Sequence, residues 1–253
     1  MEILEFGNKV NKKIILIHGF QSPYQVWNKY IEYYKKDFHI IVPILPGHNP
    51  QQKEDFVSFK KTAKEIEDYY ISRYGDNLYA MYGMSMGGVL VATIWENTRL
   101  NIEKVIFDGS PLVSYNSFIR KSILNFYLNI THKAQKRDKK TVEQAINTII
   151  SEENSIDFLN VLDHMSDATI NNCIKGVGNY KLPNNINTLN TKIYFFHGTK
   201  VNEMYARKTA RYIVKNYPDA TIKCFKGKGH CENALINPEI MIQELNDVLN
   251  YNS

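Results

Sequence analysis

The pentapeptide Gly83-Met84-Ser85-Met86-Gly87 has the pattern Gly-x-Ser-x-Gly, and a serine in this pattern can act as a covalent nucleophile. Apolar runs at residues 78–82 and 89–92 flank it. This context is typical of a sharp turn from a strand into a helix, with the serine at its tip. Glycines suit such a turn because a Cβ on either side of the serine would collide with the neighbouring helix or strand. We therefore predict that Ser85 is a nucleophile, the alternative being a glycine-rich turn without chemistry.

His230 is the histidine best placed to activate this serine. It follows Gly227-Lys228-Gly229 and comes after the last strand-like run. A general base has to reach the serine hydroxyl at about 2.6–3.2 Å, and glycines give its loop the freedom to approach. Among the seven histidines, His230 alone follows both the serine and the final strand, as the chain order serine, acid, histidine requires. We predict that His230 is the base.

The motif His18-Gly19-Phe20 ends an early apolar run at residues 13–17. Acyl transfer builds negative charge on a carbonyl oxygen, and two N–H donors have to face that oxygen. One donor is predicted to be the backbone N–H of Met86, which directly follows the nucleophile. The other is predicted to be the N–H of Phe20, with Gly19 allowing the backbone to approach closely. The His18 side chain is expected to brace this loop, and an ordinary strand-to-loop turn is the alternative.

Strand-like and helix-like runs alternate along most of the chain. Strands are predicted at residues 1–6, 13–17, 38–43, 78–82, 104–108, 192–197 and 221–225. Helices are predicted at residues 24–36, 58–74, 86–97, 203–216 and 238–250. Such alternation indicates an α/β fold with a mostly parallel sheet and helices on both faces. Functional residues of these sheets gather at the carboxyl ends of the strands, where the motifs above are placed.

One stretch interrupts the alternation, because residues 114–182 contain no strand-like run. Helical segments are predicted within it at residues 117–130, 141–150 and 155–162. We predict a mostly helical lid at residues 113–183, inserted into an α/β core of residues 1–112 and 184–253. Its aromatic residues indicate an apolar acyl pocket or, at this helical spacing, the lid's own core; they are Tyr115, Phe118, Phe126, Tyr127 and Phe158.

Four motifs, taken together and in this order, resemble those of the α/β-hydrolase family. They are His-Gly-Phe at 18–20, Pro-Gly-His at 46–48, Gly-Met-Ser-Met-Gly-Gly at 83–88 and Gly-Lys-Gly-His at 227–230. The resemblance covers nearly the whole chain. It implies an eight-stranded, mostly parallel sheet with a lid inserted after the sixth strand. It also implies a Ser–acid–His triad that uses neither a metal nor another cofactor.

The acid of this triad is where the chain departs from the family pattern. The family usually places it in the loop after the seventh strand, often as Gly-x-x-Asp, but that loop reads Gly198-Thr199-Lys200-Val201 here. Glu203 is the first carboxylate, two residues later, and a lengthened loop would bring it to the acid position. Asp108 is the second candidate, because some family members use the end of the sixth strand. Alternatively, Glu203 is only a helix N-terminal residue and Asp108 only a turn residue.

These residues predict a serine hydrolase that cleaves a carboxylic ester or thioester through an acyl-enzyme. Ser85 would attack, His230 would act as the base, and Glu203 would support the imidazolium. Alternatives within the same resemblance are C–C bond hydrolases or lyases, acyltransferases, amidases and peptidases. A hydrolase-like chain that binds a ligand without catalysis is a further alternative. The expected partner is a small-molecule acyl substrate.

Composition narrows the class of protein further. The 253 residues carry a formal net charge of +5, and 43% are hydrophobic, which is enough for one large core. No apolar run reaches the ~18 residues of a membrane span, and the first residues lack a signal-peptide pattern. Three cysteines without Cys-x-x-Cys spacing argue against a disulfide framework or a zinc site, so a cytoplasmic location is expected. The basic run at 133–140 has no accompanying aromatic pattern, so no nucleic-acid partner is predicted.

Overall fold

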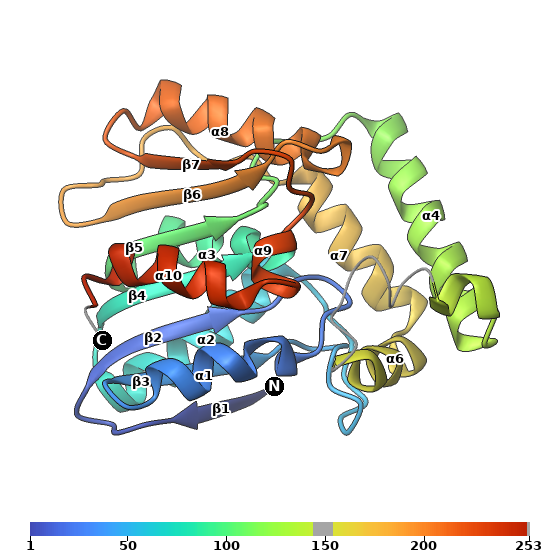
Figure 1. Cartoon of the computed structure of the whole chain (residues 1–253), viewed down its shortest axis with the longest axis horizontal. Coiled ribbons are helices and arrows are strands. Elements are labelled where there is room, and N and C mark those ends of the chain that lie inside the picture. Colours follow the sequence, from blue (N-terminus) through green and yellow to red (C-terminus); the bar gives the residue numbers. More distant parts are fainter. Residues whose placement is uncertain (144–153, 252–253) are drawn as a thin grey trace.

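The computed structural model describes residues 1–143 and 154–251, and in these ranges it contains one seven-stranded sheet (Figure 1). The strand order across the sheet is β1-β3-β2-β4-β5-β6-β7. The strands are β1 (Glu2–Phe6), β2 (Lys12–Ile17), β3 (Phe38–Ile44), β4 (Asn77–Met84), β5 (Asn101–Asp108), β6 (Lys192–Gly198) and β7 (Thr221–Phe225). β1 pairs with β3 in antiparallel orientation, and the other neighbouring pairs are parallel. The predicted mostly parallel α/β sheet is confirmed.

Continuous apolar runs form the central strands because both faces of the sheet are covered. In β2, Ile14 and Leu16 pack into one layer, whereas Ile15 and Ile17 pack into the other. The first layer contains helices α1 (Asn28–Tyr34) and α10 (Pro238–Leu249), and the second contains α2 (Phe59–Tyr74), α3 (Met86–Asn97) and α8 (Met204–Asn216). Burial of each isoleucine or leucine side chain contributes about 1.5–3 kcal/mol. A strand with this pattern is therefore stable in the middle of a three-layer fold.

The number of strands differs from the eight that the family resemblance implies. In the ranges that the structure describes there are seven, and they coincide with the seven strand-like runs of the sequence. The expected eighth strand has no apolar run of its own, since the resemblance alone implied it. The strand that ends at Asp108 is accordingly β5 rather than a sixth strand, and the helical stretch follows β5.

Helices α4 (Ser117–Gln135), α6 (Ser155–His164) and α7 (Asp167–Asn179) form between β5 and β6. They lie beside the carboxyl ends of the central strands, on the right of Figure 1. The predicted helices at 117–130 and 155–162 are confirmed, and α7 is an additional helix. The predicted helix at 141–150 lies outside the described residues from position 144 onward. The role of this segment as a lid, with boundaries at 113 and 183, stays a prediction.

Candidate active site

Ser85 occupies a strained backbone position between β4 and α3. Its φ and ψ are 50° and −114°, outside the regions that residues with a side chain normally adopt. A hydrogen bond from its N–H to the Asp108 carbonyl, 2.7 Å long, holds the turn. β4 ends at Met84 and α3 begins at Met86, directly before and after the serine. Ser85 therefore lies at the tip of a strand-to-helix turn, as its motif predicts.

Close backbone contacts explain both glycines of the motif. A Cβ on Gly83 would lie 2.5 Å from the carbonyl carbon of Gly87. A Cβ on Gly87 would lie 2.3 Å from the carbonyl oxygen of Ile17, at the end of β2. Atoms cannot approach this closely in a densely packed interior without displacing the backbone. The predicted collision with the neighbouring helix or strand is confirmed at both positions.

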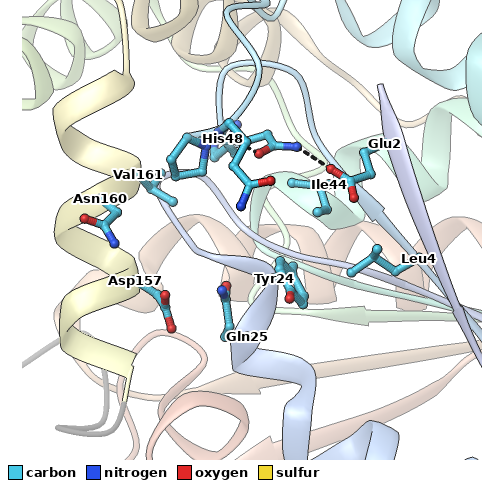
Figure 2. Close-up of a pocket in the computed structure, with 12 residues that line it drawn as sticks. Glu2, Leu4, Tyr24, Gln25, Ile44, His48, Asp157, Asn160 and Val161 are labelled. Carbon is cyan, nitrogen blue, oxygen red and sulfur yellow. Dashed lines mark hydrogen bonds between the residues drawn. The ribbon is translucent and has the colours of Figure 1, made fainter.

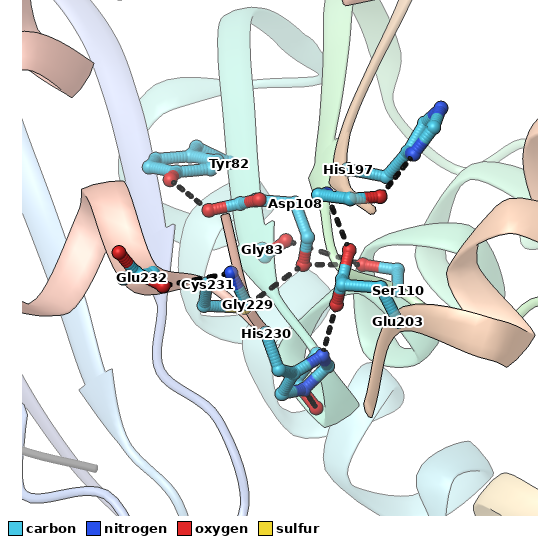
Figure 3. Close-up of polar contacts among 12 residues, drawn as sticks. Tyr82, Gly83, Asp108, Ser110, His197, Glu203, Gly229, His230, Cys231 and Glu232 are labelled. Carbon is cyan, nitrogen blue, oxygen red and sulfur yellow. Dashed lines mark hydrogen bonds and ion pairs between the residues drawn. The ribbon is translucent and has the colours of Figure 1, made fainter. Parts of the chain in front are cut away.

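His230 connects this serine to a buried carboxylate. Its Nε2 lies 2.8 Å from Ser85 Oγ, and its Nδ1 lies 2.5 Å from Glu203 Oε1. The loop between β7 and the short helix α9 (Glu232–Leu235) carries the ring to this position. When Nδ1–H donates to the carboxylate (Figure 3), Nε2 is left as the acceptor for the serine O–H. The side chains of Ser85, His230 and Glu203 thus form one continuous chain of hydrogen bonds.

Glu203 is fully buried, with 0% of its side chain exposed. It ends the 3-10 turn η3 (Val201–Glu203), immediately before α8. Its Oε2 accepts a hydrogen bond from the Gly198 N–H at 2.7 Å, so both carboxylate oxygens are held in place. Val201, where the family pattern expects an aspartate, is 87% exposed. Of the two candidate acids, Glu203 is the one that the fold brings to His230 Nδ1.

Asp108, the other candidate acid, makes a different contact. Its Oδ2 accepts a hydrogen bond from the Tyr82 O–H at 3.2 Å, and its side chain is buried (Figure 3). Burial raises the pKa of Asp108 to about 7; the charge of Glu203 adds to this shift, while His230 and the Tyr82 hydroxyl oppose it. Asp108 therefore holds the serine turn through its backbone carbonyl and places a carboxyl that titrates near pH 7 close to the imidazole.

The surroundings of His230 have opposing effects on the pKa of its imidazole. Burial lowers its pKa, but the hydrogen bond and charge of Glu203, together with the charge of Asp108, outweigh burial and raise the pKa above 6.5. The side chain is 34% exposed, so solvent and substrate can reach it. A raised pKa strengthens the imidazole as an acceptor for the serine proton.

His18 braces the loop that runs from β2 past the serine. Its Nε2 accepts a hydrogen bond from the Leu45 N–H at 3.1 Å, and its Nδ1 lies 2.9 Å from the Gly19 carbonyl, to which it donates. A Cβ on Gly19 would lie 3.6 Å from Ser85 Cβ, so the loop passes directly beside Ser85. Burial lowers the pKa of His18 to about 4, which keeps the ring neutral, as an accepting Nε2 requires. The expected bracing role is confirmed.

His48 holds the next turn of the same loop, a role that the sequence did not reveal. Its Nε2 accepts a hydrogen bond from the N–H of Gln21, which has a φ of 59°, at 3.1 Å. Its Nδ1 donates to the Pro46 carbonyl at 3.1 Å. Burial lowers the pKa of His48 to about 3, and the neighbouring His18 adds to the shift. The available signal was a histidine directly after a Pro-Gly turn at the end of a strand.

The two predicted oxyanion donors belong to these elements. Met86 is the first residue of α3, where N–H groups lack helical partners and the helix dipole is positive. The ring of Phe20 packs edge-on against Tyr127 of α4, with centroids 5.0 Å apart. The Gln21 side-chain amide donates to Thr131 Oγ1, also on α4, at 2.7 Å. The loop is thereby fastened to α4, and the donor roles of Phe20 and Met86 stay predictions.

Ser85 and His230 line a cavity of about 640 Å³. Its other walls are mainly apolar side chains from the helices beside it, namely Ile123, Phe126, Tyr127, Phe158, Ile174, Val177 and Tyr205. In the part of the chain that the structure describes, no Lys, Arg, Asp or Glu side chain lines this cavity. Four of the five aromatic residues singled out in the helical stretch face it, and the exception, Phe118, is 81% exposed.

Comparisons with known proteins support the fold described above. No protein-family model matches the chain. A curated relative, a pimeloyl-[acyl-carrier protein] methyl ester esterase of Legionella pneumophila, is 22% identical over 222 residues, which are 86% of this chain and 87% of the relative. An alpha/beta hydrolase family protein from Desulfitobacterium hafniense matches with a TM-score of 0.79 at 18% identity, over 98% of this chain and 100% of that one. MenH from S. aureus matches with a TM-score of 0.72 at 16% identity, over 98% of both chains.

The chain has the α/β-hydrolase fold.

Next to His230, Glu232 stabilises a loop of this α/β-hydrolase fold. Its Oε2 accepts a hydrogen bond from the Gly229 N–H at 2.8 Å and pairs with Lys200, and its Oε1 pairs with Lys228. The hydrogen bond from Lys200, followed by that from the Gly229 N–H, lowers the pKa of Glu232 to about 2. Glu232 therefore fixes the loop that carries His230.

Figure 2 shows a second pocket of the α/β-hydrolase fold, which is about 200 Å³ in volume. Residues of β1, β3, α6 and the 3-10 turn η1 (Tyr24–Trp27) surround it, among them Glu2, Ile44 and Asn160. Neither Ser85, His230 nor Glu203 lines this pocket, whereas His48 does. Of these two cavities, Ser85 and His230 therefore line only the larger, and His48, which accepts the hydrogen bond of Gln21 at the wall of the larger cavity, also lines the smaller pocket.

The described part of the α/β-hydrolase fold contains neither a candidate metal-binding cluster nor a candidate membrane-spanning helix. Residues 1–143 and 154–251 contain no group of three or more His, Cys, Asp or Glu side chains able to hold a metal ion. No helix in these ranges combines the length and the apolar character that crossing a membrane requires.

Proposed function

We propose that the protein is a serine hydrolase that cleaves carboxylic esters through an acyl-enzyme on Ser85. The observation that carries this proposal is the position of His230, whose ring nitrogens lie 2.8 Å from Ser85 Oγ and 2.5 Å from Glu203 Oε1. A serine hydroxyl is a weak nucleophile until a base accepts its proton and a third group orients that base. The names of similar proteins support the same class, because the Legionella relative and several of the solved neighbours are esterases.

In the acylation step, Ser85 Oγ attacks the acyl carbon while its proton moves to His230 Nε2. Glu203 stabilises the imidazolium through its hydrogen bond to Nδ1 and keeps the ring in the orientation that faces the serine. The N–H groups of Phe20 and Met86 hold the negative oxygen of the tetrahedral intermediate. His230 then gives the proton to the leaving alkoxide, so that the C–O bond breaks and the alcohol departs.

In the deacylation step, a water molecule takes the place of the alcohol. His230 Nε2 accepts a proton from this water as its oxygen attacks the acyl carbon. The second tetrahedral intermediate collapses when the proton returns to Ser85 Oγ, which releases the carboxylic acid. The 34% exposure of the His230 side chain leaves room for the water to approach.

The lining of the cavity indicates the class of acyl group. Its walls carry no cationic side chain in the described part of the chain, so a second carboxylate on the substrate would have no ion-pair partner there. Apolar and aromatic side chains instead favour an uncharged aliphatic or aromatic acyl chain. A volume of about 640 Å³ is within the range of small-molecule sites. We therefore propose neutral esters and thioesters with apolar acyl groups as substrates.

A panel of p-nitrophenyl esters with increasing acyl length tests this proposal directly. Matched thioesters and anilides should be included, because the same triad chemistry serves thioesterases and amidases. We expect turnover of esters, with acyl chains of intermediate length preferred over acetate. Absence of turnover on every ester, thioester and amide would contradict the proposal and favour a protein that binds ligands without catalysis.

The pH profile provides a separate prediction. Only the neutral imidazole accepts the serine proton, so kcat/KM should fall as the pH drops through the pKa of His230. Because that pKa is raised, the acid limb should lie above pH 6.5. The charge of Asp108 contributes to the raised pKa of His230, so Asp108→Asn should move the limb to lower pH. The exposed Asp76→Asn is the matched control and should leave the profile unchanged; a wild-type limb below pH 6.5 would contradict the predicted environment of His230.

Acyl selectivity should depend on Ile174, a buried residue of α7 that lines the cavity. Ile174→Phe adds side-chain volume to the wall, so kcat/KM for an octanoyl ester should fall roughly tenfold, about 1.4 kcal/mol, while acetyl turnover changes little. Ile156→Phe is the control, because Ile156 is 73% exposed and lies outside the cavity. An equal loss on both esters would show that the acyl chain does not lie against α7.

A further inference from the structure

Three lysines lie near the amino ends of the strands, whereas Ser85 lies at their carboxyl ends. Lys12 on β2, Lys104 on β5 and Lys192 on β6 line a hollow of about 590 Å³. Lys104 and Lys192 are direct neighbours across the parallel pair β5–β6. Strand spacing places neighbouring backbones about 5 Å apart, and like charges at such positions weaken a sheet. The hollow therefore brings several positive charges together, and their repulsion lowers the stability of the fold.

Lys104 is buried, with 4% exposure, and its contacts are those of a cation without a counter-ion. Its Nζ donates a hydrogen bond to the Tyr79 hydroxyl at 2.5 Å and lies 4.1 Å from the centroid of that ring. Lys12 Nζ lies 4.3 Å from the same centroid. Across the described ranges, none of the three lysines forms an ion pair with a carboxylate. Two ammonium groups thus share one aromatic ring.

Other groups near the hollow offset this charge only in part. The Tyr79 hydroxyl donates to the Leu249 carbonyl at the end of α10, where the helix dipole is negative. Glu103 and Asp219 also line the hollow, but both are exposed, and solvent screens their charges. Burial lowers the pKa of Lys104; Glu103 opposes this shift, and Lys12 and Lys192 add to it. The buried ammonium retains an unmet preference for an anion.

We propose that this hollow, which we call the lysine site, binds a small oxyanion, either a carboxylate or a phosphate, between Lys12, Lys104 and Lys192. Ammonium groups form charge-assisted hydrogen bonds with both kinds of oxyanion. Thr188, Asn190 and Thr191 in the loop before β6 supply further polar groups at its edge. Phe38 and Leu249 supply apolar walls, which leave room for a short organic chain on the anion. This binding site is separate from the proposed hydrolysis, because the two sites lie at opposite ends of the strands.

Calorimetric titration and thermal unfolding with two probes test the lysine site. The probes are inorganic phosphate and butyrate, each at constant ionic strength with chloride as the reference anion. We expect at least one probe to bind and to raise the Tm of the wild-type protein by about 3 °C at ten times its Kd. Response to phosphate alone identifies a phosphate ligand, and response to butyrate alone identifies a carboxylate.

Lys104→Met keeps the length of the side chain and removes its charge. This variant should lose the anion response while it keeps wild-type ester turnover, and its Tm without anion should equal or exceed that of the wild type. Lys175→Met, at an exposed position of α7, is the matched control and should respond like the wild type. An equal response from Lys104→Met and wild type, or no response to either probe in wild type, overturns the proposal.

Exposed lysines supply a second test that does not disturb the core. Lys12→Gln and Lys192→Gln change side chains at the rim of the lysine site, so folding should be preserved. Each should weaken anion binding at least threefold. Unchanged affinity in both variants would overturn the proposal even if Lys104→Met fails to fold. Loss of esterase activity in Ser85→Ala leaves all of these binding results unaffected, so the two proposals fail independently.

Discussion

Ser85→Ala should reduce kcat/KM for the best p-nitrophenyl ester by about 10⁴-fold to 10⁶-fold and abolish covalent labelling by a fluorophosphonate probe. The reason is that the substitution removes the oxygen that would form the acyl-enzyme, while the N–H donors and the cavity remain. Alanine fits the backbone turn as serine does, so the Tm should stay close to that of the wild type. Active-site titration with the probe, read by intact mass, measures the labelled fraction directly.

A second serine in the same cavity supplies the control for this experiment. Ser22 lines the cavity and is buried, and its hydroxyl has no hydrogen-bond partner within the described part of the chain. Ser22→Ala should therefore keep both labelling and most of the turnover. Labelling that persists in Ser85→Ala would refute Ser85 as the nucleophile and would make Ser22 the next residue to test.

Glu203→Gln should lower kcat by about 10³-fold to 10⁴-fold with a small change in KM. Both carboxylate oxygens accept hydrogen bonds, from the Gly198 N–H and from His230 Nδ1, but a carboxamide offers only one acceptor. If the amide oxygen faces Gly198, its NH₂ faces the ring and favours the tautomer in which Nε2 carries the proton. In that tautomer Nε2 cannot accept the proton of Ser85. The loss should therefore appear in the chemical step and persist at all pH values.

Asp108→Asn is the matched comparison for the acid. Asp108 contacts Tyr82 rather than the imidazole, and asparagine can keep that contact, so kcat at the optimum pH should fall less than tenfold. The expected change is the shift of the acid limb described above. A large loss in Asp108→Asn with near-normal activity in Glu203→Gln would reverse the assignment of the acid.

Local patterns along the chain were enough to identify the proposed nucleophile and the proposed base, which the fold brings within 2.8 Å of each other. Ser85 lies in a motif whose glycines are needed wherever strand and helix approach so closely, and His230 follows the last strand with glycines before it. Each of these signals is carried by residues adjacent in sequence. The alternation of apolar runs likewise predicts the strands, because a buried strand needs such a run whatever its neighbours are. The eighth strand, which had no run of its own, is absent from the described ranges.

Contacts between distant segments were harder to foresee. Glu203 and Asp108 were both candidates for the acid. The path of the chain through η3 decides which carboxylate contacts His230, because it brings Glu203, rather than residue 201, to the imidazole. The hydrogen bond of Tyr82 to Asp108 joins residues 26 apart, and that of Gln21 to His48 joins residues 27 apart. No local pattern shows which residues are in contact, although His48 belongs to the Pro-Gly-His motif. Such contacts follow from the packing of the whole fold.

The two buried, neutral histidines that hold the active-site loop, His18 and His48, also make the stability of the fold depend on pH. In the unfolded chain His18 and His48 would bind protons near pH 6.5, whereas burial lowers their folded pKa values to about 4 and about 3. Between those limits the unfolded state binds more protons than the folded state, so the free energy of unfolding decreases as the pH falls. In the proposed mechanism, activity therefore declines first, through His230 at a pH above 6.5, and conformational stability declines at lower pH through these two rings. Acid would thus act on the protein in two ways, first by protonating the proposed base and then by favouring the unfolded state, in which both buried rings can become charged.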